Sequence, residues 1–368
     1  MGDVTDPKSI VVPSRFPSMS SCKSEPVAVG LVGCGWIAEI AHVPALVGSR
    51  TGHLVAASDS DPARRAWLGA RVPGVRLHHG WEALIEDRGV SAVIIALPTA
   101  LHAEVACRAF AAGKHVYLEK PIALTLDEGR RAVGAWRQAK TVGVIGYNFR
   151  RNPIVESARR TLAAGELGSL VAIQGSFHWA AERIEGWRSE SGMGGGALLD
   201  LVSHHVDLVA AFSGQRIVQV QGTLRSVRSP DDTAALQLLT DNGLVAQLQG
   251  SSAAGAPVNR LDLVGTTGVL RVDLLDGRPR PVERAPGPGA RLIRARGALG
   301  GFHPARLLRS PGFEPSFRAT IEAFLEAVRS GVPPRPDLSD GLRALAVIEA
   351  AEASARAGGR SVPVPADG

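Results

Sequence analysis

A glycine-rich turn between an apolar run and a helical stretch constrains the fold of this chain more than any other feature. The run Val27–Val32 is continuously apolar, as expected of a strand buried on both faces of a sheet. Gly33, Gly35 and Ala38 follow with the spacing G-x-G-x-x-A, and a helical pattern begins at Trp36. The first glycine permits a tight turn, the second lets a pyrophosphate approach the backbone, and the alanine lets the helix pack closely on the strand. The sequence therefore predicts a dinucleotide-binding turn here.

The same turn predicts which groups meet the dinucleotide. The helix N-terminus at Trp36 and Ile37 offers free N–H groups and about half a positive charge to the phosphates. Asp59 lies 21 residues beyond Ala38, at the end of a second apolar run, where a carboxylate accepts hydrogen bonds from the adenosine ribose. A carboxylate repels a 2′-phosphate, and Ser60 follows where an arginine would suit the phosphorylated cofactor better. NAD(H) is therefore favoured over NADP(H), and a plain glycine turn with a surface aspartate is the alternative.

Strand-like and helix-like segments alternate from residue 25 to residue 146. Asp61 and Pro62 form the N-cap and first-turn proline typical of a helix start, and Gly113 follows the end of another helical stretch. Such alternation predicts right-handed βαβ units on a parallel, doubly wound sheet. We therefore expect a flexible tail over 1–24, which is rich in Ser and Pro, and an NAD-binding Rossmann domain over 25–146.

The alternation stops after Tyr147. Short β-type runs follow, and Asn242-Gly243 between two of them is a tight hairpin signal. One helical stretch near 196–212 interrupts these runs, and two more helices are expected near the C-terminus. The expected fold class is α/β, with a doubly wound N-terminal Rossmann domain and a second α/β domain over 147–368. That second domain, for substrate binding and oligomerisation, would contain a large open and mostly antiparallel sheet.

An acid, a base and a proline end the predicted strand His115–Leu118 as Glu119-Lys120-Pro121. The carboxyl end of a parallel strand faces the ligand crevice of such a sheet. Lys120 at that point can donate to a substrate oxygen and to the nicotinamide ribose, and a cis bond to Pro121 would fix its direction. A solvated Glu–Lys pair at a strand end is the alternative.

Asp200 and His204 form a second candidate pair on the helical stretch near 196–212. Residues four apart share one face of a helix, so the carboxylate can orient the imidazole and stabilise its charged form. His204 can then take a proton from an alcohol near neutral pH. His205 lies about 100° further around the helix and is not expected to share that face. The alternative is an ordinary ion pair on a helix surface.

Five pieces of the sequence, in order, resemble the glucose–fructose oxidoreductase / inositol dehydrogenase family, often written Gfo/Idh/MocA. They are Gly33–Ala38, Pro98–His102, Ala112–Pro121, Gly146–Arg151, and Trp187-Arg188 followed by Gly194–His204. The match runs from about Val27 to Val364, and Glu-Lys-Pro followed by Gly-Gly-Gly…Asp-x-x-x-His is its most specific part. The resemblance implies a Rossmann domain, a second domain on an open sheet, and a homodimer or homotetramer.

The resemblance also implies roles for single residues. Four of them would lie beside the cofactor, together with Lys120: Pro98, Thr99, His102 and Glu119. Many relatives carry Asn at the position of Thr99, so a side-chain contact there is in doubt. Four more are candidates for the wall of a substrate pocket: Tyr147, Arg151, Trp179 and Trp187. Tyr and Trp suit stacking on a sugar or cyclitol ring, although a single tryptophan is as often part of a core.

The reaction implied is hydride transfer between NAD(H) and a secondary alcohol or ketone. His204 would remove the hydroxyl proton, Lys120 would hold the same oxygen, and Asp200 would orient His204. The expected substrate is a sugar, a sugar derivative or an (amino)cyclitol such as an inositol, and the Asp200/His204 pair favours a polyol over a sugar nucleotide. Two alternatives are an NAD-assisted, glycoside-cleaving enzyme of the same fold and a dinucleotide-binding sensor without catalysis. The Ala-, Gly- and Arg-rich composition favours, by association only, a role in secondary metabolism.

Charge and cysteine content exclude other classes. Of the net charge of +6, most lies in residues 281–312, where six arginines and one glutamate among Pro and Gly indicate a solvated basic loop rather than a nucleic-acid-binding face. The three cysteines are too widely spaced for a disulfide framework or a zinc site, and Cys34 has no histidine nearby to activate it. With no long apolar stretch, we expect a cytoplasmic protein that binds a small molecule and neither metal, nucleic acid nor membrane.

Overall fold

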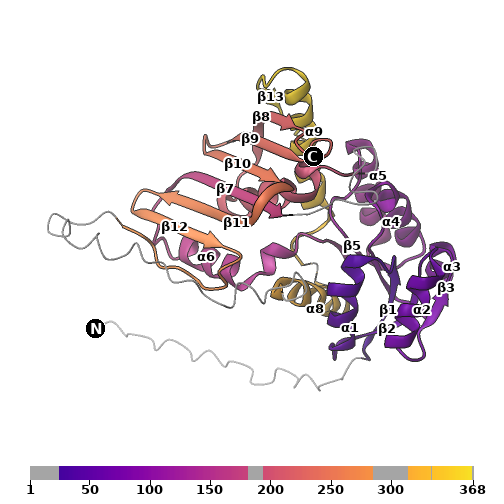
Figure 1. Ribbon diagram of the computed structural model, residues 1–368. Helices are drawn as coiled ribbons and strands as arrows, with labels where there is room; N and C mark the ends of the chain where they lie inside the picture. Colours follow the sequence, from indigo (N-terminus) through magenta and orange to yellow (C-terminus); the bar gives the residue numbers. More distant parts are fainter. Residues whose placement is uncertain (1–24, 181–193, 285–313, 333, 367–368) are drawn as a thin grey trace, which may run out of the picture.

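The computed structural model describes residues 25–180, 194–284, 314–332 and 334–366 of the 368-residue chain. Two sheets, here called the first and the second sheet, lie side by side with helices packed on them (Figure 1). The expected tail 1–24, most of the expected basic loop 281–312, and Trp187 lie outside the described residues. Among the described residues, no helix is long and apolar enough to cross a membrane.

The first sheet has six parallel strands in the order β3-β2-β1-β4-β5-β6. Its strands are β1 (Val27–Val32), β2 (Gly52–Ser58), β3 (Arg76–His78), β4 (Ala92–Ile95), β5 (His115–Leu118) and β6 (Gly143–Ile145). The strand order reverses between β1 and β4, and ligands of such sheets bind beyond the carboxyl ends of the strands at that point. The predicted doubly wound Rossmann fold is confirmed.

Helices lie between these strands, and α2 begins where Asp61 and Pro62 predict. They are η1 (Ala38–His42), α1 (Val43–Val47), α2 (Pro62–Arg71), α3 (Trp81–Glu86), η2 (Thr99–Leu101), α4 (His102–Ala111) and α5 (Leu126–Ala139). The Asp61 carboxylate accepts a hydrogen bond from the Ala63 amide at 2.8 Å, which caps α2. Thr125 and Glu128 cap α5 reciprocally.

The second sheet has seven strands in the order β12-β11-β7-β10-β9-β8-β13 and is antiparallel except between β7 and β10. Its strands are β7 (Leu170–Ala180), β8 (Ile217–Arg225), β9 (Thr233–Thr240), β10 (Val245–Ser251), β11 (Ala253–Gly265), β12 (Gly268–Asp273) and β13 (Val362–Pro363). The predicted hairpin at Asn242-Gly243 joins β9 to β10. The predicted open, mostly antiparallel sheet is confirmed.

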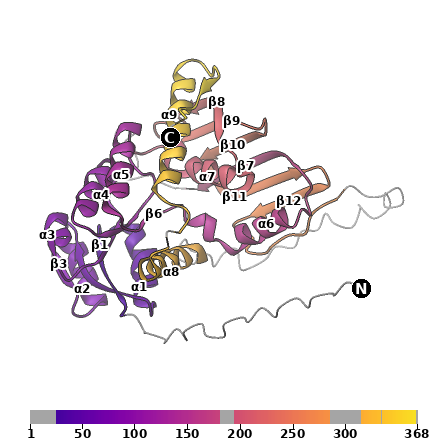
Figure 2. The same ribbon diagram turned by 180° about the vertical axis from the view of Figure 1, so that it is seen from behind.

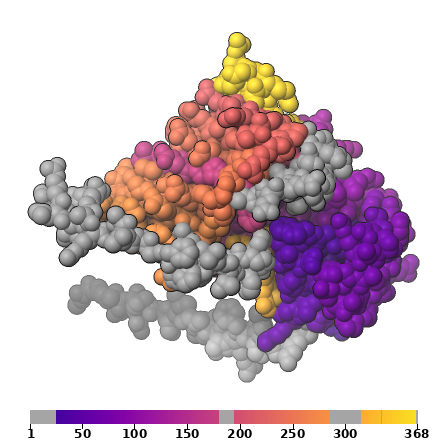
Figure 3. Space-filling view, in the orientation of Figure 1, coloured from indigo at the N-terminus to yellow at the C-terminus, as the bar shows by residue number. Residues whose placement is uncertain are grey.

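Among the described residues, the helices of this half cover one face of the second sheet, as the view from behind shows (Figure 2). The segments of this half are η3 (Asn148–Arg151), α6 (Pro153–Ala163), η6 (Leu198–Val202), α7 (Ser203–Ser213) and α9 (Leu338–Arg356). The sequence analysis did not predict α6, whose N-terminus is capped by the Asn152 side chain. The opposite face of the sheet lies on the surface (Figure 3). Exposed and buried residues alternate along β8, β9 and β10, so the exposed, mostly polar residues lie on this open face.

Helix α8 (Pro315–Ser330) returns from the second half to pack on the first sheet. Ile321, Phe324 and Leu325 are fully buried in one cluster with Leu31 of β1 and Tyr117 of β5. Each large apolar side chain buried in this way stabilises the fold by about 1.5–3 kcal/mol. The expected division at residue 147 places α8 with the second domain, so this helix crosses that boundary, which stays a prediction.

Candidate functional site

The phosphate turn has the backbone that its sequence requires. Gly33 has φ +92°, and a Cβ on it would come within 2.4 Å of the Ala96 carbonyl oxygen, so only glycine fits. A Cβ on Gly35 would meet nothing nearer than a guanidinium nitrogen of Arg64 at 3.6 Å, so this side of the turn is open. Trp36, just after it, is half exposed. The turn therefore has room for a pyrophosphate at the N-terminus of η1, and the residues present fit a dinucleotide.

The Asp59 carboxylate is held beside this turn. Its Oδ2 accepts a hydrogen bond from the Cys34 amide at 2.8 Å, and its Oδ1 accepts one from the Asp61 amide at 2.9 Å. A carboxylate oxygen has two lone pairs, so each keeps one for a ribose hydroxyl. The Cys34 thiol, in contrast, is buried and points at the Ser58 carbonyl, 3.8 Å away. Burial raises the pKa of Cys34 to about 12, which removes its nucleophilic form at neutral pH.

Two loops at the carboxyl ends of β4 and β5 are joined by His102. This side chain is 1% exposed, with Nδ1 2.6 Å from the Pro121 carbonyl oxygen and Nε2 2.8 Å from the Leu97 carbonyl oxygen. Thr99 is also buried, and a Cβ on Gly194 would come within 2.6 Å of its hydroxyl. The segment after β4 thus touches both the Glu-Lys-Pro motif and the glycine-rich segment before α7.

Lys120 reaches across to the second half of the chain. Its Nζ donates hydrogen bonds to the Asp200 backbone oxygen at 2.6 Å and to Asp200 Oδ1 at 2.9 Å. The Lys120 side chain is 13% exposed and that of Asp200 is 32% exposed, so the pair lies at a surface that a small molecule can reach. The Lys120–Pro121 peptide bond is cis.

Glu119 points the other way, into the first half. It is 8% exposed, and its Oε1 lies 2.9 Å from Nε2 of the fully buried His42. Its other oxygen lies against Gly146, where a Cβ would come within 2.9 Å. Glu119 thereby links the helix of the phosphate turn to the strand that carries Lys120.

His204 lies among aromatic rings at the inner end of the site. It is 7% exposed, and its ring centroid is 4.5 Å from that of Phe149, 5.8 Å from that of Tyr147 and 6.1 Å from that of Phe177. Burial lowers the pKa of His204 well below 6.5, and the charge of Lys120 lowers it further, while Asp200 opposes both. The imidazole is therefore neutral at pH 7 and able to accept a proton.

His205, the next residue, faces away from this group. Its Nε2 lies 2.9 Å from the Asn259 side-chain oxygen, and its ring stacks on Phe177 with centroids 5.6 Å apart. The two histidines thus diverge, as the helical turn between them predicts.

The candidates for a substrate wall lie in different surroundings. Tyr147 is 1% exposed and packs edge-on against His204, and burial raises the pKa of its phenol. Arg151 donates to the Arg335 carbonyl oxygen at 3.4 Å, while its neighbour Arg150 makes a buried, two-point ion pair with Asp207. Trp179 is 36% exposed near the end of β7, where the two-residue repeat of a strand places it on the same face as Phe177.

Sequence reasoning missed the aromatic surroundings of His204. Phe149 lies in Gly146–Arg151, one of the five pieces that resemble the family, but the sequence alone indicates no role for this ring. Phe177 lies on a predicted strand whose pairing partners were unknown. Among the described residues, no group of three or more His, Cys, Asp or Glu side chains is placed to hold a metal ion.

Comparisons with known proteins agree on one family. The model of the Gfo/Idh/MocA oxidoreductase family with an NAD-binding Rossmann fold matches residues 27–149, and that of the Gfo/Idh/MocA C-terminal domain matches residues 155–271. The chain is 31% identical over 321 residues to dTDP-3,4-didehydro-2,6-dideoxy-alpha-D-glucose 3-reductase of Streptomyces violaceoruber, covering 82% of this chain and 85% of the relative. It is 27% identical to inositol 2-dehydrogenase of Rhizobium meliloti, covering 88% and 96% of the two chains.

Solved structures show the same fold. The WlbA dehydrogenase from Bordetella pertussis, in complex with NADH and UDP-GlcNAcA, superimposes with a TM-score of 0.79 at 23% identity, over 93% of this chain and 99% of the other. The resemblance predicted from the five sequence pieces is confirmed. The chain belongs to the Gfo/Idh/MocA family of NAD-dependent oxidoreductases, and its first half is the NAD-binding Rossmann domain of that family.

Proposed function

We propose that this protein interconverts a secondary alcohol and a ketone on a sugar, a sugar derivative or an (amino)cyclitol. The observation that carries the proposal is the contact of Lys120 with Asp200, next to His204. It brings a cation, a carboxylate and a neutral imidazole together beyond the carboxyl end of β5, where the ligands of this fold bind. When bound, NAD(H) supplies the hydride acceptor or donor.

Lys120 is the group that holds the reacting oxygen. Its ammonium has three protons, and two of them point at Asp200. The third can be donated to a substrate hydroxyl or carbonyl oxygen, and the positive charge stabilises the negative charge that develops there. Asp200 limits the directions in which the Lys120 ammonium can point. Its carboxylate also favours the charged form of His204.

His204 is the group that takes the hydroxyl proton. Its neutral form at pH 7 provides an acceptor without prior deprotonation, and the nearby Asp200 carboxylate stabilises the imidazolium once formed. In the direction of ketone reduction, the same imidazolium returns the proton to the oxygen. The aromatic rings around His204 exclude water from its buried side.

The substrate class rests on the relatives and on the exposed groups near the site. A sugar-nucleotide reductase and an inositol dehydrogenase are both similar to this chain over more than four-fifths of its length. Trp179 offers a partly exposed ring on the site face of β7, and such a ring can stack on the apolar face of a sugar or cyclitol. The paired Lys120 and Asp200 offer donors and acceptors to vicinal hydroxyls.

A substrate panel tests this function. We expect NADH formation from at least one compound among inositols, aminocyclitols and aldoses, and we expect His204→Gln to lower kcat at least about 10²-fold while NADH still binds. Tightly bound NAD that never turns over, combined with cleavage of a glycoside, would instead identify the glycoside-cleaving alternative. Tight NADH binding with no turnover of any kind would leave a sensor.

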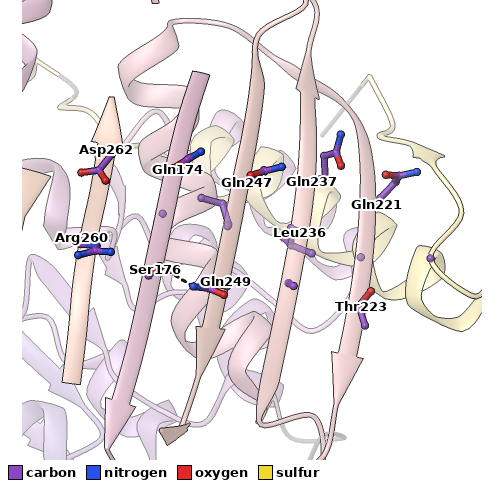
Figure 4. A pocket seen from close by; sticks show the side chains of 15 residues that line it. Gln174, Ser176, Gln221, Thr223, Leu236, Gln237, Gln247, Gln249, Arg260 and Asp262 are labelled. Carbon is purple, nitrogen blue, oxygen red and sulfur yellow. Dashed lines mark hydrogen bonds between the residues drawn. The ribbon is translucent and has the colours of Figure 1, made fainter. Parts of the chain in front are cut away.

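We also propose that copies of this chain associate through the open face of the second sheet. A row of polar side chains crosses six strands of this face in register: Arg271, Asp262, Gln174, Gln247, Gln237 and Gln221. Figure 4 shows most of them lining a shallow hollow of the sheet. Amides donate and accept, so such a row can pair with the same row of a second copy.

Light scattering after size-exclusion chromatography tests the association. We expect a dimer or tetramer for the native chain and a single chain for the double variant Gln237→Glu, Gln247→Glu, because like charges would then face each other across the interface. A native chain that elutes as a monomer contradicts this proposal without affecting the enzymatic one.

A further inference from the structure

Two neighbouring residues of η3 contact two residues on one face of α7. Phe149 packs its ring on that of His204, with the centroids 4.5 Å apart. Arg150, the next residue, forms an ion pair with Asp207, three residues after His204 on the same helix. Residues three apart lie side by side on a helix surface. The ring contact and the ion pair therefore join the same two segments at adjacent points.

The ion pair between Arg150 and Asp207 is buried and has two parallel hydrogen bonds. Arg150 Nε donates to Asp207 Oδ2 at 2.8 Å, and its Nη2 donates to Oδ1 at 2.6 Å. The two side chains are 12% and 2% exposed. A two-point pair of a guanidinium and a carboxylate fixes direction as well as distance, whereas apolar packing is not directional. The pair therefore fixes the position of η3 against α7 more narrowly than packing alone.

The imidazole of His204 depends on its surroundings for its orientation. Its buried Nδ1 has no hydrogen-bond partner among the described residues. In many catalytic histidines the corresponding nitrogen donates to a carboxylate or a carbonyl oxygen, which sets the direction of the ring. Here the rings of Phe149, Tyr147 and Phe177 surround the imidazole instead, and Phe149 is the nearest of the three.

The segment that carries Phe149 is too short to hold this ring in place by itself. It is one turn of 3₁₀-helix, four residues long. Two side chains anchor it to other helices: Asn148 donates to the Ser316 hydroxyl of α8 at 2.8 Å, and Arg150 binds Asp207 of α7. Of these two anchors, the second reaches the helix of the base.

We propose that Arg150 and Asp207 are positioning residues for the reaction: their ion pair holds Phe149 against His204, which sets the direction of the imidazole and excludes water from its buried side. Both residues act through Phe149 and not on the substrate. The inference rests on the proposed function, in which His204 takes the hydroxyl proton.

The His204 pKa of the folded, full-length chain tests the positioning without any turnover. It is followed by NMR of the ring protons, with His204→Gln to identify the signal. Lys120, Asp200 and His205 act on the charge of His204, and all three are unchanged. In Asp207→Asn the two-point pair is lost and water reaches the imidazole, so its pKa should rise by at least about half a unit toward 6.5. Loss of the Asp207 charge alone would lower that pKa, so a rise identifies loss of positioning.

Turnover gives a second measurement. We expect kcat of Asp207→Asn to fall at least about tenfold and its affinity for NADH to stay within about threefold of native, because the base is displaced while the phosphate turn is unchanged. Arg150→Lys keeps the charge but loses the second parallel hydrogen bond, so its kcat and its His204 pKa should lie between those of Asp207→Asn and the native chain. Arg150→Lys keeps the buried charges balanced, so it decides the question if Asp207→Asn does not fold.

Asp340→Asn is the matched control. Asp340 is 7% exposed and its Oδ1 lies 3.4 Å from Nη2 of the same arginine, but it belongs to α9 and not to the helix of His204. Its carboxylate also accepts hydrogen bonds from Arg335 and from the Asp337 amide. The substitution should therefore lower the free energy of unfolding in urea, while the His204 pKa and kcat stay at their native values.

Three outcomes overturn the inference. They are an unchanged or lower His204 pKa in the folded Asp207→Asn and Arg150→Lys variants, a raised pKa with native kcat, and an equal rise of the pKa in Asp340→Asn, which would indicate general loosening of the fold. If no substrate turns over in the native chain, the proposed alcohol chemistry fails, but the pKa measurements still decide whether the ion pair positions His204.

Discussion

Lys120 and His204 come from opposite halves of the molecule and are held by different physical means. Lys120 stands at the carboxyl end of β5, and its charge is balanced by the Asp200 carboxylate 2.9 Å away. His204 stands on α7 beneath the second sheet, and its charge is suppressed by the aromatic rings that bury it. One half of the site thus keeps a charge by pairing it, and the other keeps a base neutral by excluding water.

The difference predicts how each half responds to substitution. A paired cation depends on charge, so a neutral replacement of similar size removes its effect at once. A buried imidazole depends on packing, so changes in the surrounding rings alter its pKa by degrees. Charge changes at Lys120 should therefore abolish turnover, whereas packing changes around His204 should shift its pH dependence.

Lys120→Met gives the largest expected effect. Methionine retains most of the length of the side chain but has no charge and no donor, so we expect kcat to fall about 10²- to 10⁴-fold. NADH should still bind, because the phosphate turn and Asp59 are untouched, and the loss of a hydrogen bond from Lys120 to the nicotinamide ribose should weaken it by no more than about tenfold. Steady-state kinetics with the best substrate of the panel and an NADH titration measure both.

The matched control is Lys140→Met, at an exposed position after α5, where no change is expected. A kcat of Lys120→Met within threefold of the native value would contradict the proposed role of the ammonium. It would also remove the contrast between the two halves.

Substitution of His205 tests whether burial of a histidine makes the folded protein less stable in acid. Burial lowers its pKa from 6.5 to about 4, and its Nδ1 has no hydrogen-bond partner among the described residues. Below pH 6.5 the unfolded chain binds a proton that the folded chain refuses until about pH 4, so stability falls as the pH falls through this window. The full loss from this one group is about 3 kcal/mol.

Urea unfolding at pH 7.5 and at pH 4.5 measures this loss. In His205→Asn the difference between the two free energies of unfolding should be smaller than in the native chain by up to about 3 kcal/mol. His79→Asn, at an exposed histidine, should leave the difference unchanged. An equal acid loss in native and His205→Asn protein would show that burial of His205 does not contribute.

The sequence allowed the first half of the fold to be predicted more completely than the second. In the first sheet the short strands β4 and β6 are fully buried, and the starts of α2 and α5 are marked by the caps Asp61 and Thr125. Strands that follow each other along the chain pair with each other, except β3 and β4. The turn at Gly33 and Lys120 at a strand end are consequences of this local order. The helix α8 is one of the two helices predicted near the C-terminus, but its apolar residues indicate only which face is buried. That its partner is the first sheet depends on contacts between residues about 270 positions apart, such as Glu322 of α8, which accepts a hydrogen bond from Thr51 just before β2.

The candidate site shows the same limit. Lys120, Asp200 and His204 were each identified from local patterns, and the structure brings them together. The ion pair between Lys120 and Asp200 could not be predicted from the sequence. The four-residue spacing of Asp200 and His204 indicates instead that these two residues pair with each other.

Phe149 tests how far packing tunes the imidazole. Phe149→Leu leaves a space beside His204, and water entering it should raise the pKa of the imidazole toward 6.5. The acid limb of the pH profile of kcat/KM should then move up by about one pH unit or less, and activity at pH 6 should fall relative to pH 8 by less than about fourfold, the limit that a pKa of 6.5 sets.

Phe177→Leu is the matched control for Phe149→Leu. Its ring is 6.1 Å from that of His204 rather than 4.5 Å, and we expect a smaller shift of the acid limb. Lys120, Asp200 and His205 also act on the charge of His204, and all three are unchanged in both variants. Following the His204 ring protons by NMR across the same pH range measures the pKa directly. An unchanged pKa in Phe149→Leu would mean that this ring does not control the imidazole.

Substitution of Cys34 is expected to have the smallest effect on kcat, and alkylation of its thiol tests burial near the phosphate turn. A pKa of about 12 instead of the ordinary 9.0 lowers its thiolate fraction at pH 8 about 10³-fold, so alkylation by iodoacetamide should be slower by a similar factor. Peptide mass mapping should find Cys34 unmodified in the folded chain and modified in urea, and Cys34→Ser should retain kcat within about twofold. Rapid alkylation of the folded chain, or a tenfold loss of kcat in Cys34→Ser, would require a reactive thiol in the turn. The Cys34 thiolate would then be stabilised by a nearby charge, as the Lys120 ammonium is by Asp200. Burial would no longer explain the chemistry of the phosphate turn.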